Sequence, residues 1–351
     1  MTRPAVTLHT IAERAGVHFS LVSRVLRGDP LARLSKEKRE QVIAIAAELG
    51  YRPNRVARSL RARQSRILAM LVPDITNPFH AVMFRGVEAA AQAEGYSVIL
   101  CNTDDEDERF RSLVSVLSEG HVDGLLVASA KHDDQTIDWL QTQRLPFVLM
   151  NRRREQGGDP WVGPDDYRMG TLGAEHLAER GHRHLLLLIG DLSIDNMRLR
   201  ARGFFERLRE FGIAEGDVLV RSNLMSHEQA RSAVAGLVPQ IRAGEITAVF
   251  ALSTIASLGA VAAFGSAGVR WPQEVSIVGY SASGAPDITS IQPPTAEIGA
   301  AAARYLIERL RAGGEANQEP AEALNIALPV RLIDCGSARA VDGMAPAATS
   351  A

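Results

Sequence analysis

The chain has 351 residues, of which 46% are hydrophobic, and its formal net charge is −2, so it is long enough for two or three packed units with a sizeable core. Its two cysteines, Cys101 and Cys335, form no pattern typical of disulfides or of a structural zinc site. The sequence shows no apolar signal-peptide region and no long apolar run, so we expect a cytoplasmic protein that does not enter a membrane.

The charge is unevenly distributed along the chain. Residues 1–66 contain fourteen Lys or Arg and five Asp or Glu, a net charge of +9, whereas the remainder carries −11. A basic N-terminal segment followed by an acidic remainder favours a nucleic-acid-binding module joined to a second module. A solvated arginine-rich surface would produce the same charge, so the motifs have to decide between the two interpretations.

Apolar residues at helical spacing predict three helices within residues 6–50. The first ends at Gly16, the second follows it directly, and the third begins after Ser35 and ends at Gly50. Two helices joined by a tight turn that contains glycine are typical of a helix-turn-helix.

A break and a short helix follow this predicted helix-turn-helix. Residues 51–53 are expected to be extended, because the residue before Pro53 avoids the helical conformation. Asn54 can then cap a helix over about residues 54–61. A helix this short is marginal alone in water, so it needs a partner chain, DNA or both.

Beyond residue 66, apolar runs of strand length alternate with helical stretches. The runs are Ile67–Val72, Ser97–Cys101, Gly124–Ala128, Phe147–Met150, His184–Ile189, Ala248–Ala251 and Val275–Val278. This alternation predicts βαβ units with parallel sheets covered on both faces. A domain of roughly 270 residues usually divides into two lobes, and its ligands bind beyond the C-terminal ends of the strands. The tail, residues 336–351, is rich in Ala, Ser and Gly and is expected to be disordered.

Several long motifs resemble the LacI/GalR family of bacterial repressors. They are Val6–Val17 with Val22–Leu26, Leu49–Leu60, Val72–Phe79, Gly181–Arg183 and Val275–Gly279. The resemblance covers about residues 5–333. It implies an all-α helix-turn-helix DNA-binding domain with a hinge helix in residues 1–62. It further implies a two-lobed α/β domain, similar to periplasmic binding proteins and built on parallel sheets, in residues 63–335.

The function implied by this resemblance is that of a transcriptional regulator, most often a repressor. Such a protein binds double-stranded operator DNA as a homodimer and responds to a small-molecule effector, and it needs no catalytic residue, metal or cofactor. The tail after Asp334 lacks the leucine-repeat helix of family tetramers, so we expect a dimer.

The resemblance also assigns the residues that contact DNA. They are Thr7, Phe19, Ser20, Ser23, Arg24, Asn54, Ala57 and Leu60. Phe19, Ser20 and Arg24 match base-reading positions of a helix that lies in the major groove. Leu60 matches a hinge-helix leucine that inserts into the minor groove and kinks the duplex. The other residues match phosphate contacts, which set register, or, for Ala57, close helix approach.

Two positions in the helix-turn-helix depart from the family pattern. The family usually has serine where this chain has His18, and threonine where it has Leu21. Histidine is a weaker N-cap than serine, and leucine lacks a hydroxyl that could reach a phosphate. We therefore expect a different operator or a lower affinity.

The effector-binding residues implied by the resemblance are Asn77, Phe79, Asn102, Asp165, Arg198, Ser253 and Ser281. Arg198 is the foremost polar candidate, because a guanidinium suits hydroxyl and carboxylate groups. The family often has Asn-Asp where this chain has Ser253-Thr254, and Asp at the position of Ser281. Fewer carboxylates beside Arg198 favour an anionic or less hydroxyl-rich ligand over a neutral sugar. The alternative is that the cleft has lost its response to an effector.

Two other functions remain open. A solute-binding or sensor protein would share the two-lobed body, but it would not carry a helix-turn-helix. An enzyme with a doubly wound fold would need a nucleotide fingerprint or a catalytic set, and the sequence supports neither. His182 and His184 lack the further ligands that a metal site requires.

Overall fold

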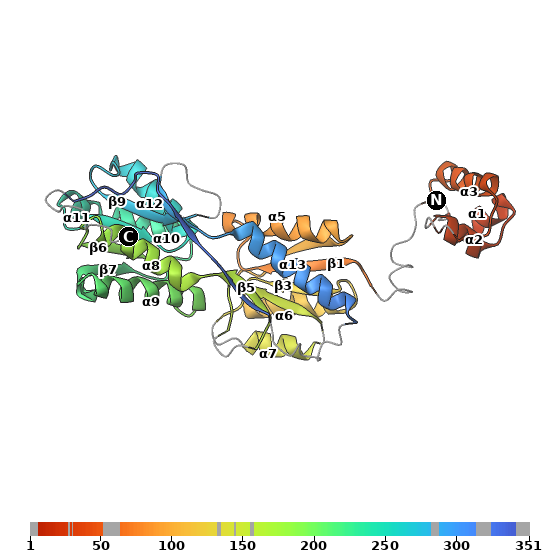
Figure 1. Ribbon diagram of the computed structural model, residues 1–351, viewed down its shortest axis with the longest axis horizontal. Coiled ribbons are helices and arrows are strands. Elements are labelled where there is room, and N and C mark those ends of the chain that lie inside the picture. The colour runs from red at the N-terminus through yellow and green to blue at the C-terminus, as the bar shows by residue number, and fades with distance from the viewer. Residues whose placement is uncertain are drawn as a thin grey trace, which may run out of the picture. The chain divides into compact units, whose positions relative to one another are not determined.

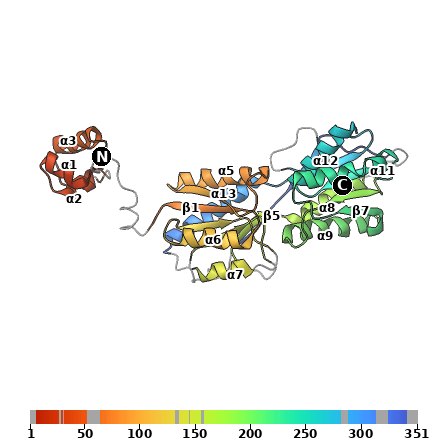
Figure 2. The same ribbon diagram turned by 180° about the vertical axis from the view of Figure 1, so that it is seen from behind.

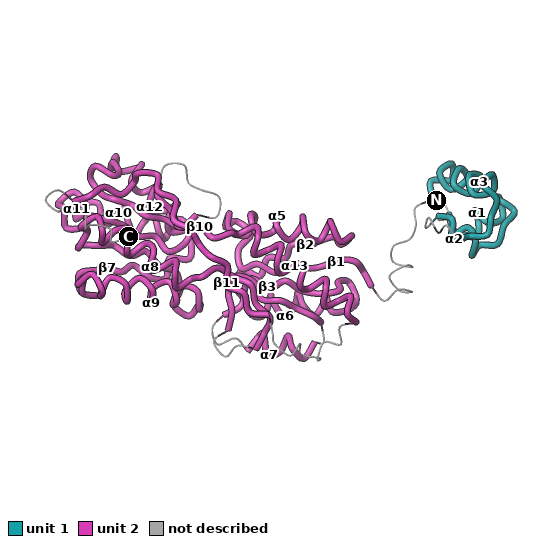
Figure 3. The backbone as a smooth tube through the Cα atoms, viewed as in Figure 1, with its two compact units in different colours: residues 1–63 teal, residues 64–351 magenta. Residues whose placement is uncertain are grey.

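The computed structural model describes residues 6–26, 29, 31–51, 64–131, 135–143, 145–154, 158–281, 288–313 and 324–341. The chain divides into two compact units, residues 1–63 and residues 64–351 (Figure 3). The division falls next to the boundary expected after residue 62. The short helix predicted over residues 54–61 lies outside the described residues. No described helix is long and apolar enough to cross a membrane.

The first unit contains the three predicted helices. They are α1 (Leu8–Ala15), α2 (Phe19–Leu26) and α3 (Lys36–Glu48). Thr7 caps α1 by accepting a hydrogen bond from the amide of Thr10, and Gly16 ends α1 in the left-handed conformation that glycine adopts without strain. Ile11, Val22 and Val42, one from each helix, are fully buried in a shared core. The helix-turn-helix therefore has its own small apolar core.

The second unit contains two six-stranded sheets (Figures 1 and 2). The first sheet has the order β11-β5-β4-β3-β1-β2, and the second has the order β12-β10-β9-β8-β6-β7. The first consists of β1 (Ile67–Val72), β2 (Ser97–Asn102), β3 (Gly124–Val127), β4 (Phe147–Met150), β5 (Trp161–Pro164) and β11 (Asn325–Leu328). The second consists of β6 (Leu185–Leu188), β7 (Val218–Arg221), β8 (Ala248–Ala251), β9 (Ser276–Tyr280), β10 (Thr289–Gln292) and β12 (Arg331–Ile333). Among the described strands, only β12 pairs antiparallel, with β10.

Helices cover both faces of each sheet (Figures 1 and 2). The first lobe has α5 (Pro78–Ala93) and α13 (Thr295–Arg311) on one face, with α6 (Asp107–Ser118) and α7 (Gln135–Thr142) on the other. The second lobe has α8 (Asp166–Ala178) and α9 (Asp195–Glu210) on one face, and α10 (His227–Ala235), α11 (Val238–Arg242) and α12 (Thr254–Ala267) on the other. A short 3-10 helix, Glu215–Asp217, precedes β7.

The central strands are apolar on both faces, as the sequence predicted. In β1, Leu68 and Met70 pack in the cluster beneath α5 and α13, whereas Ala69 and Leu71 pack in the cluster beneath α6 and α7. Strand side chains alternate between faces, so a strand covered on both sides needs an unbroken apolar run. The predicted fold class, a helix-turn-helix domain with a two-lobed α/β domain, is confirmed.

Five strands were absent from the prediction. They are β5, β7, β10, β11 and β12. Each is only three or four residues long, and β11 and β12 lie at sheet edges. The edge strands β7, β11 and β12 expose side chains to water and therefore lack the apolar run on which the prediction relied. Strands β5 and β10 lie inside their sheets, but their four residues include glycine or polar residues and so form no apolar run either.

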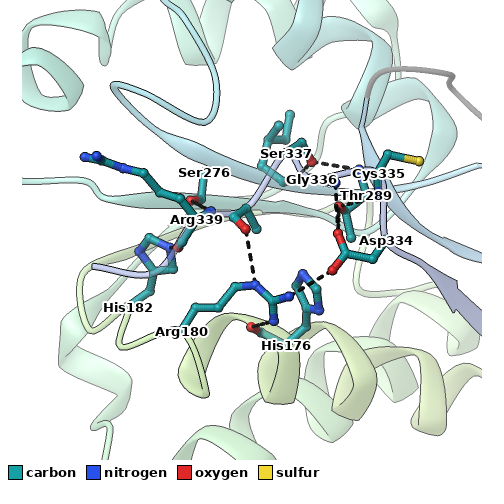
Figure 4. Close-up of polar contacts among 12 residues, drawn as sticks. His176, Arg180, His182, Ser276, Thr289, Asp334, Cys335, Gly336, Ser337 and Arg339 are labelled. Atoms are coloured by element: carbon teal, nitrogen blue, oxygen red, sulfur yellow. Dashed lines mark hydrogen bonds and ion pairs between the residues drawn. The ribbon is translucent and has the colours of Figure 1, made fainter. Parts of the chain in front are cut away.

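The beginning of the predicted disordered tail is ordered, which corrects that prediction. Ser337 and Ala338 are buried, and Figure 4 shows this segment lying against the second lobe. The hydroxyl of Ser337 donates to the carbonyl of Ile277 at 2.6 Å and accepts from the amide of Thr289 at 2.7 Å. Hydrogen bonds to the second sheet and to the carbonyl of Arg180, which composition does not reveal, hold this segment in place. Residues 342–351 lie outside the described residues.

Glycines allow two pairs of helices to cross closely. A Cβ at Gly86 of α5 would lie 1.9 Å from the carbonyl oxygen of Ala296 in α13. In the second lobe, a Cβ at Gly170 of α8 would lie 2.0 Å from the carbonyl oxygen of Arg200 in α9. Each crossing therefore excludes even a methyl group.

We predict that Gly86→Ala destabilises the second unit by about 1–3 kcal/mol, because the added methyl group forces α5 and α13 apart. Gly265→Ala in α12 is the matched control, since a Cβ at that position would meet no described atom within 4 Å. The control should leave stability unchanged or raise it by about 0.5–1 kcal/mol. Urea unfolding followed by circular dichroism measures both, and equal effects of the two substitutions would refute the close-crossing argument.

His182 is a buried histidine that links the C-terminal segment to the second lobe (Figure 4). Its Nδ1 lies 3.0 Å from Thr247 Oγ1, and its Nε2 lies 3.0 Å from the carbonyl oxygen of Arg339. Burial lowers the pKa of His182 from 6.5 to about 4. Between pH 6.5 and about pH 4, His182 binds a proton in the unfolded chain but not in the folded chain. His182 therefore lowers the free energy of unfolding as the pH falls.

We therefore predict that His182→Gln weakens the acid destabilisation. Glutamine can keep hydrogen bonds but does not titrate. Between about pH 7 and pH 4.5 the wild type should lose about 1–2 kcal/mol more stability than the variant. Unfolding free energies at the two pH values test this, and identical losses would contradict it.

Candidate functional site

The start of α2 carries two of the three predicted base-reading residues, Phe19 and Ser20. Phe19 is half-buried, and its ring stacks on His9 at 4.7 Å between centroids and lies 4.5 Å from the ring of His18. The hydroxyl of Ser20 lies 2.8 Å from Nδ1 of His18, which also accepts the amide of Ser20 at 3.4 Å. His18 therefore does cap the start of α2, despite the weaker capping expected of histidine.

The loop that follows α2 holds the third predicted base-reading residue. Nε of Arg24 donates to the carboxylate of Asp29 at 2.8 Å, and Nη2 donates to the carbonyl of Leu31 at 2.9 Å. These bonds fix the direction of the guanidinium at the last turn of α2.

The structure places the remaining predicted DNA contacts as follows. Thr7 is exposed and caps α1. Ser23 is half-buried on α2. Asn54, Ala57 and Leu60 lie outside the described residues, so their predicted contacts with DNA stay predictions.

In the second unit, a cleft of about 310 Å³ lies beyond the C-terminal ends of strands from both sheets. This is where the sequence predicted the ligand site. Its described lining residues are Pro73, Asp74, Asn77, Phe79, His80, Asp104, Asp105, Asn151, Arg152, Gly190, Asp191, Ile194, Asn196, Met197, Arg200, Leu224, Met225, Ser253, Thr254, Ile255 and Tyr280.

Three of the seven predicted effector residues line this cleft. Asn77 caps α5, with its side-chain oxygen accepting the amide of Phe79 at 3.1 Å. The ring of Phe79 lies 5.9 Å from that of Tyr280, so an aromatic pair joins the two lobes at the cleft. Ser253 caps α12 by accepting the amide of Ala256 at 3.1 Å.

Three others of the seven are not among the described lining residues. Asn102 accepts the backbone amide of Ile75 at 2.9 Å and so supports the loop before α5. Asp165 caps α8 by accepting the amide of Arg168 at 2.9 Å. Ser281 is buried and follows β9. Asn102 and Asp165 therefore bond to nearby backbone amides instead of lining the cleft.

Arg198 lies outside the cleft, contrary to the prediction, and lines a second hollow on the other side of α9. Arg200 takes the expected place at the cleft. Residues two apart on a helix point in nearly opposite directions, about 200° around the axis. The sequence places both arginines in one arginine-rich stretch, so it could not show which of them faces inward.

Arg200 is fully buried and occupies the floor of the cleft. Its Nε donates to Asp166 at 2.7 Å, its Nη1 donates to the carbonyl of Leu252 at 2.7 Å, and its guanidinium lies 4.3 Å from the ring centroid of Tyr280. Burial raises the pKa of Asp166 above its usual value, and the charge of Arg200 opposes this rise. Burial likewise raises the pKa of Tyr280, so this phenol stays neutral.

Within the part of the chain that the structure describes, four buried polar atoms along the cleft have no hydrogen-bond partner. They are His80 Nδ1, Asn151 Oδ1, Asn196 Oδ1 and Thr254 Oγ1. Burial lowers the pKa of His80 to about 3, so its imidazole is neutral near pH 7. Because a buried polar group without a partner costs free energy, their convergence on one cleft indicates a place for a polar ligand. None of these residues was among the predicted effector contacts.

The described lining of the cleft is richer in carboxylates than in cations. Its carboxylates are those of Asp74, Asp104, Asp105 and Asp191, and its cations are Arg152 and Arg200. Both arginines are already in ion pairs, Arg152 with Asp105 at 2.8 Å and Arg200 with Asp166. Asp104 is paired too, with Arg109, so the lining carboxylates outside these ion pairs are Asp74 and Asp191. The cleft therefore offers hydrogen-bond acceptors more readily than positive charge.

Both units match known protein families. Residues 7–54 match bacterial regulatory proteins of the lacI family, and residues 65–334 match the family of periplasmic binding proteins and sugar binding domains of the LacI family.

Individual relatives match along nearly the whole chain. The HTH-type transcriptional regulator DegA of Bacillus subtilis is 28% identical over 93% of this chain and 96% of its own. The structure of the Lac repressor dimer bound to operator and the anti-inducer ONPF has a TM-score of 0.81, with 25% identity, and covers 96% of this chain and 100% of that one. The complex of the transcriptional regulator CelR with cellobiose has a TM-score of 0.68, with 28% identity over 95% of this chain and 100% of that one. The protein described here therefore belongs to the LacI family of bacterial transcription regulators.

Proposed function

We propose that this regulator is a cytoplasmic homodimeric repressor whose α2 reads an operator and whose cleft binds a neutral, hydroxyl-rich effector that changes the affinity for DNA. Residues 1–62 would bind DNA, and residues 63–335 would bind the effector and the second subunit. The observation that carries the effector assignment is the set of buried, unpaired polar atoms along a carboxylate-rich cleft.

The preference for a neutral ligand follows from the charges of the cleft. A carboxylate or phosphate ligand would meet the carboxylates of Asp74 and Asp191 and would have to compete with Asp166 for Arg200. Sugar hydroxyls instead donate to such acceptors, while the Phe79 and Tyr280 rings provide apolar surface. The anionic ligand considered from the sequence is therefore the less favoured one, and the sugar-bound relative CelR agrees with a sugar-like ligand.

Coupling to DNA requires that the effector distinguishes two arrangements of the lobes. The cleft meets this condition, because its walls come from both lobes, and β5, β10 and β11 lead directly into segments that cross between them. A ligand that contacts Asn151 in one lobe and Thr254 in the other would stabilise a closed arrangement.

For operator reading, we predict that Arg24→Ala weakens binding to the specific operator by about 1–3 kcal/mol and changes non-specific binding little. Arg14→Ala is the control: Arg14 is an exposed α1 arginine paired with Glu48 at 2.6 Å, so the same charge is removed away from α2. An operator selected from random duplexes, titrated at fixed salt, provides the measurement. Equal losses on specific and non-specific DNA in both variants would mean that Arg24 contributes charge alone.

For the effector, we predict that a neutral monosaccharide or disaccharide shifts operator affinity by about 5–150-fold, while uronic acids of the same size do not. Thr254→Val should weaken that sugar's binding by about tenfold, because one buried hydroxyl is lost. Ser290→Ala is the control, since Ser290 Oγ is buried and unpaired but is not part of the described cleft lining. Calorimetry with a sugar panel tests this, and selective binding of the uronic acids would overturn the neutral-ligand assignment.

A further inference from the structure

A second hollow, of about 640 Å³, lies on the opposite side of α9 from the effector cleft. Its described lining residues are Leu149, Arg153, Arg154, Gly158, Asp159, Trp161, Asp195, Arg198, Leu199, Arg202 and Asn325. Residues from β4, β5, β11 and the loop after β4 belong to the first lobe, and the α9 residues belong to the second. The volume is within the range of small-molecule sites.

Helix α9 lies between the two cavities and turns opposite faces toward them. Asp195, Arg198 and Arg202 line the second hollow at spacings of three and four residues, whereas Asn196 and Arg200 line the cleft. Residues three and four apart share one face of a helix. The same helix thus presents one face to each cavity.

The two cavities have opposite charge. The described lining of the second hollow has four arginines, Arg153, Arg154, Arg198 and Arg202, against the carboxylates of Asp159 and Asp195. In the cleft, the carboxylates outnumber the arginines among the described lining residues. The hollow therefore attracts anionic ligands, which the cleft disfavours.

Both acidic groups of the hollow face arginines, although Asp195 Oδ2 is buried and accepts no hydrogen bond within the described residues. Asp159 binds Arg154 at 2.7 Å. Asp195 accepts the backbone amide of Arg153 at 3.0 Å and lies 3.4 Å from Nε of the same residue. Burial raises the pKa of Asp195, which reduces its opposition to an anion.

A platform of arginine on tryptophan forms one wall of the hollow. The guanidinium of Arg153 lies 4.5 Å from the ring centroid of Trp161, and its Nη1 donates to Asn325 Oδ1 at 3.5 Å. Stacking holds a guanidinium flat and preorganised, with donors left at its edge for a phosphate. Arg198 and Arg202, one helical turn apart, add two more cations from the facing lobe. Arg202 also pairs with Glu206 at 2.9 Å, but this pair is exposed to water and therefore weak, so a phosphate can replace the carboxylate.

We propose that this hollow is a second ligand site, distinct from the effector cleft, that binds a small phosphorylated metabolite between the arginines of the two lobes. The phosphate accepts charge-assisted hydrogen bonds from Arg153, Arg198 and Arg202. Because α9 forms a wall of both cavities, a ligand here biases the same lobe arrangement that the cleft effector biases, and the regulator responds to two classes of metabolite.

The test uses calorimetry on the full-length protein with three probes: inorganic pyrophosphate, ribose 5-phosphate and ribose. The variant is Arg198→Gln with Arg202→Gln. The control is Arg209→Gln with Arg231→Gln, which removes the same charge from exposed arginines outside the described lining. Circular dichroism melting verifies that each variant is folded.

We expect the wild type to bind pyrophosphate and ribose 5-phosphate. The Arg198/Arg202 variant should lose about tenfold or more in affinity for both, since each lost guanidinium removes charge-assisted hydrogen bonds. The control should retain wild-type affinity.

Three results would overturn the proposal. One is the absence of binding of either phosphate probe at millimolar concentration. Another is an equal loss in the control variant, which would indicate general electrostatic attraction, including attraction to the basic first unit. The third is the loss of pyrophosphate binding in Thr254→Val, which would place the anion in the effector cleft.

Discussion

The buried ion pair between Arg200 and Asp166 is the contact on which the effector domain depends. It joins α9 to α8 beneath the cleft, and the same guanidinium also bonds the end of β8 and covers the ring of Tyr280. A buried charge is tolerated only when it is paired and hydrogen-bonded, and removal of one partner leaves the other exposed to a large desolvation cost. The pair therefore fixes the floor against which any ligand has to pack, and Gly170 makes the required closeness of α8 and α9 possible.

Helix α9 gives the second unit its chemical asymmetry. Its inward face contributes Asn196 and Arg200 to a cleft in which the positive charge is already neutralised, and its other face contributes Arg198 and Arg202 to an arginine-rich hollow. The two faces of α9 thus line two different cavities, one suited to hydroxyl groups and the other to phosphate. Both cavities draw residues from both lobes, so a movement of one lobe against the other changes both at once.

Much of the fold was predictable because long apolar runs report burial directly. The unbroken run over residues 67–72 indicated a strand covered on both faces, and β1 is such a strand. The short strands β10 and β12 gave no comparable signal, because partners distant in sequence stabilise them through backbone hydrogen bonds. The ordered segment around Ser337 escaped prediction for the same reason: its composition resembles that of a disordered tail, but its hydrogen bonds with β9 and Thr289 hold it.

The sequence by itself determined the helix-turn-helix, the two-lobed α/β body and the membership of a repressor family, because periodicity and ordered motifs are local properties of the chain. The family resemblance carried by these motifs also assigned Asn77, Phe79 and Ser253 to the cleft, where the structure places them. Only the tertiary structure decided that Arg200 rather than Arg198 faces inward, and which buried polar atoms are left unpaired. Orientation around a helix axis and the pairing of buried charges depend on what packs against each face, and neighbours along the chain do not carry that information.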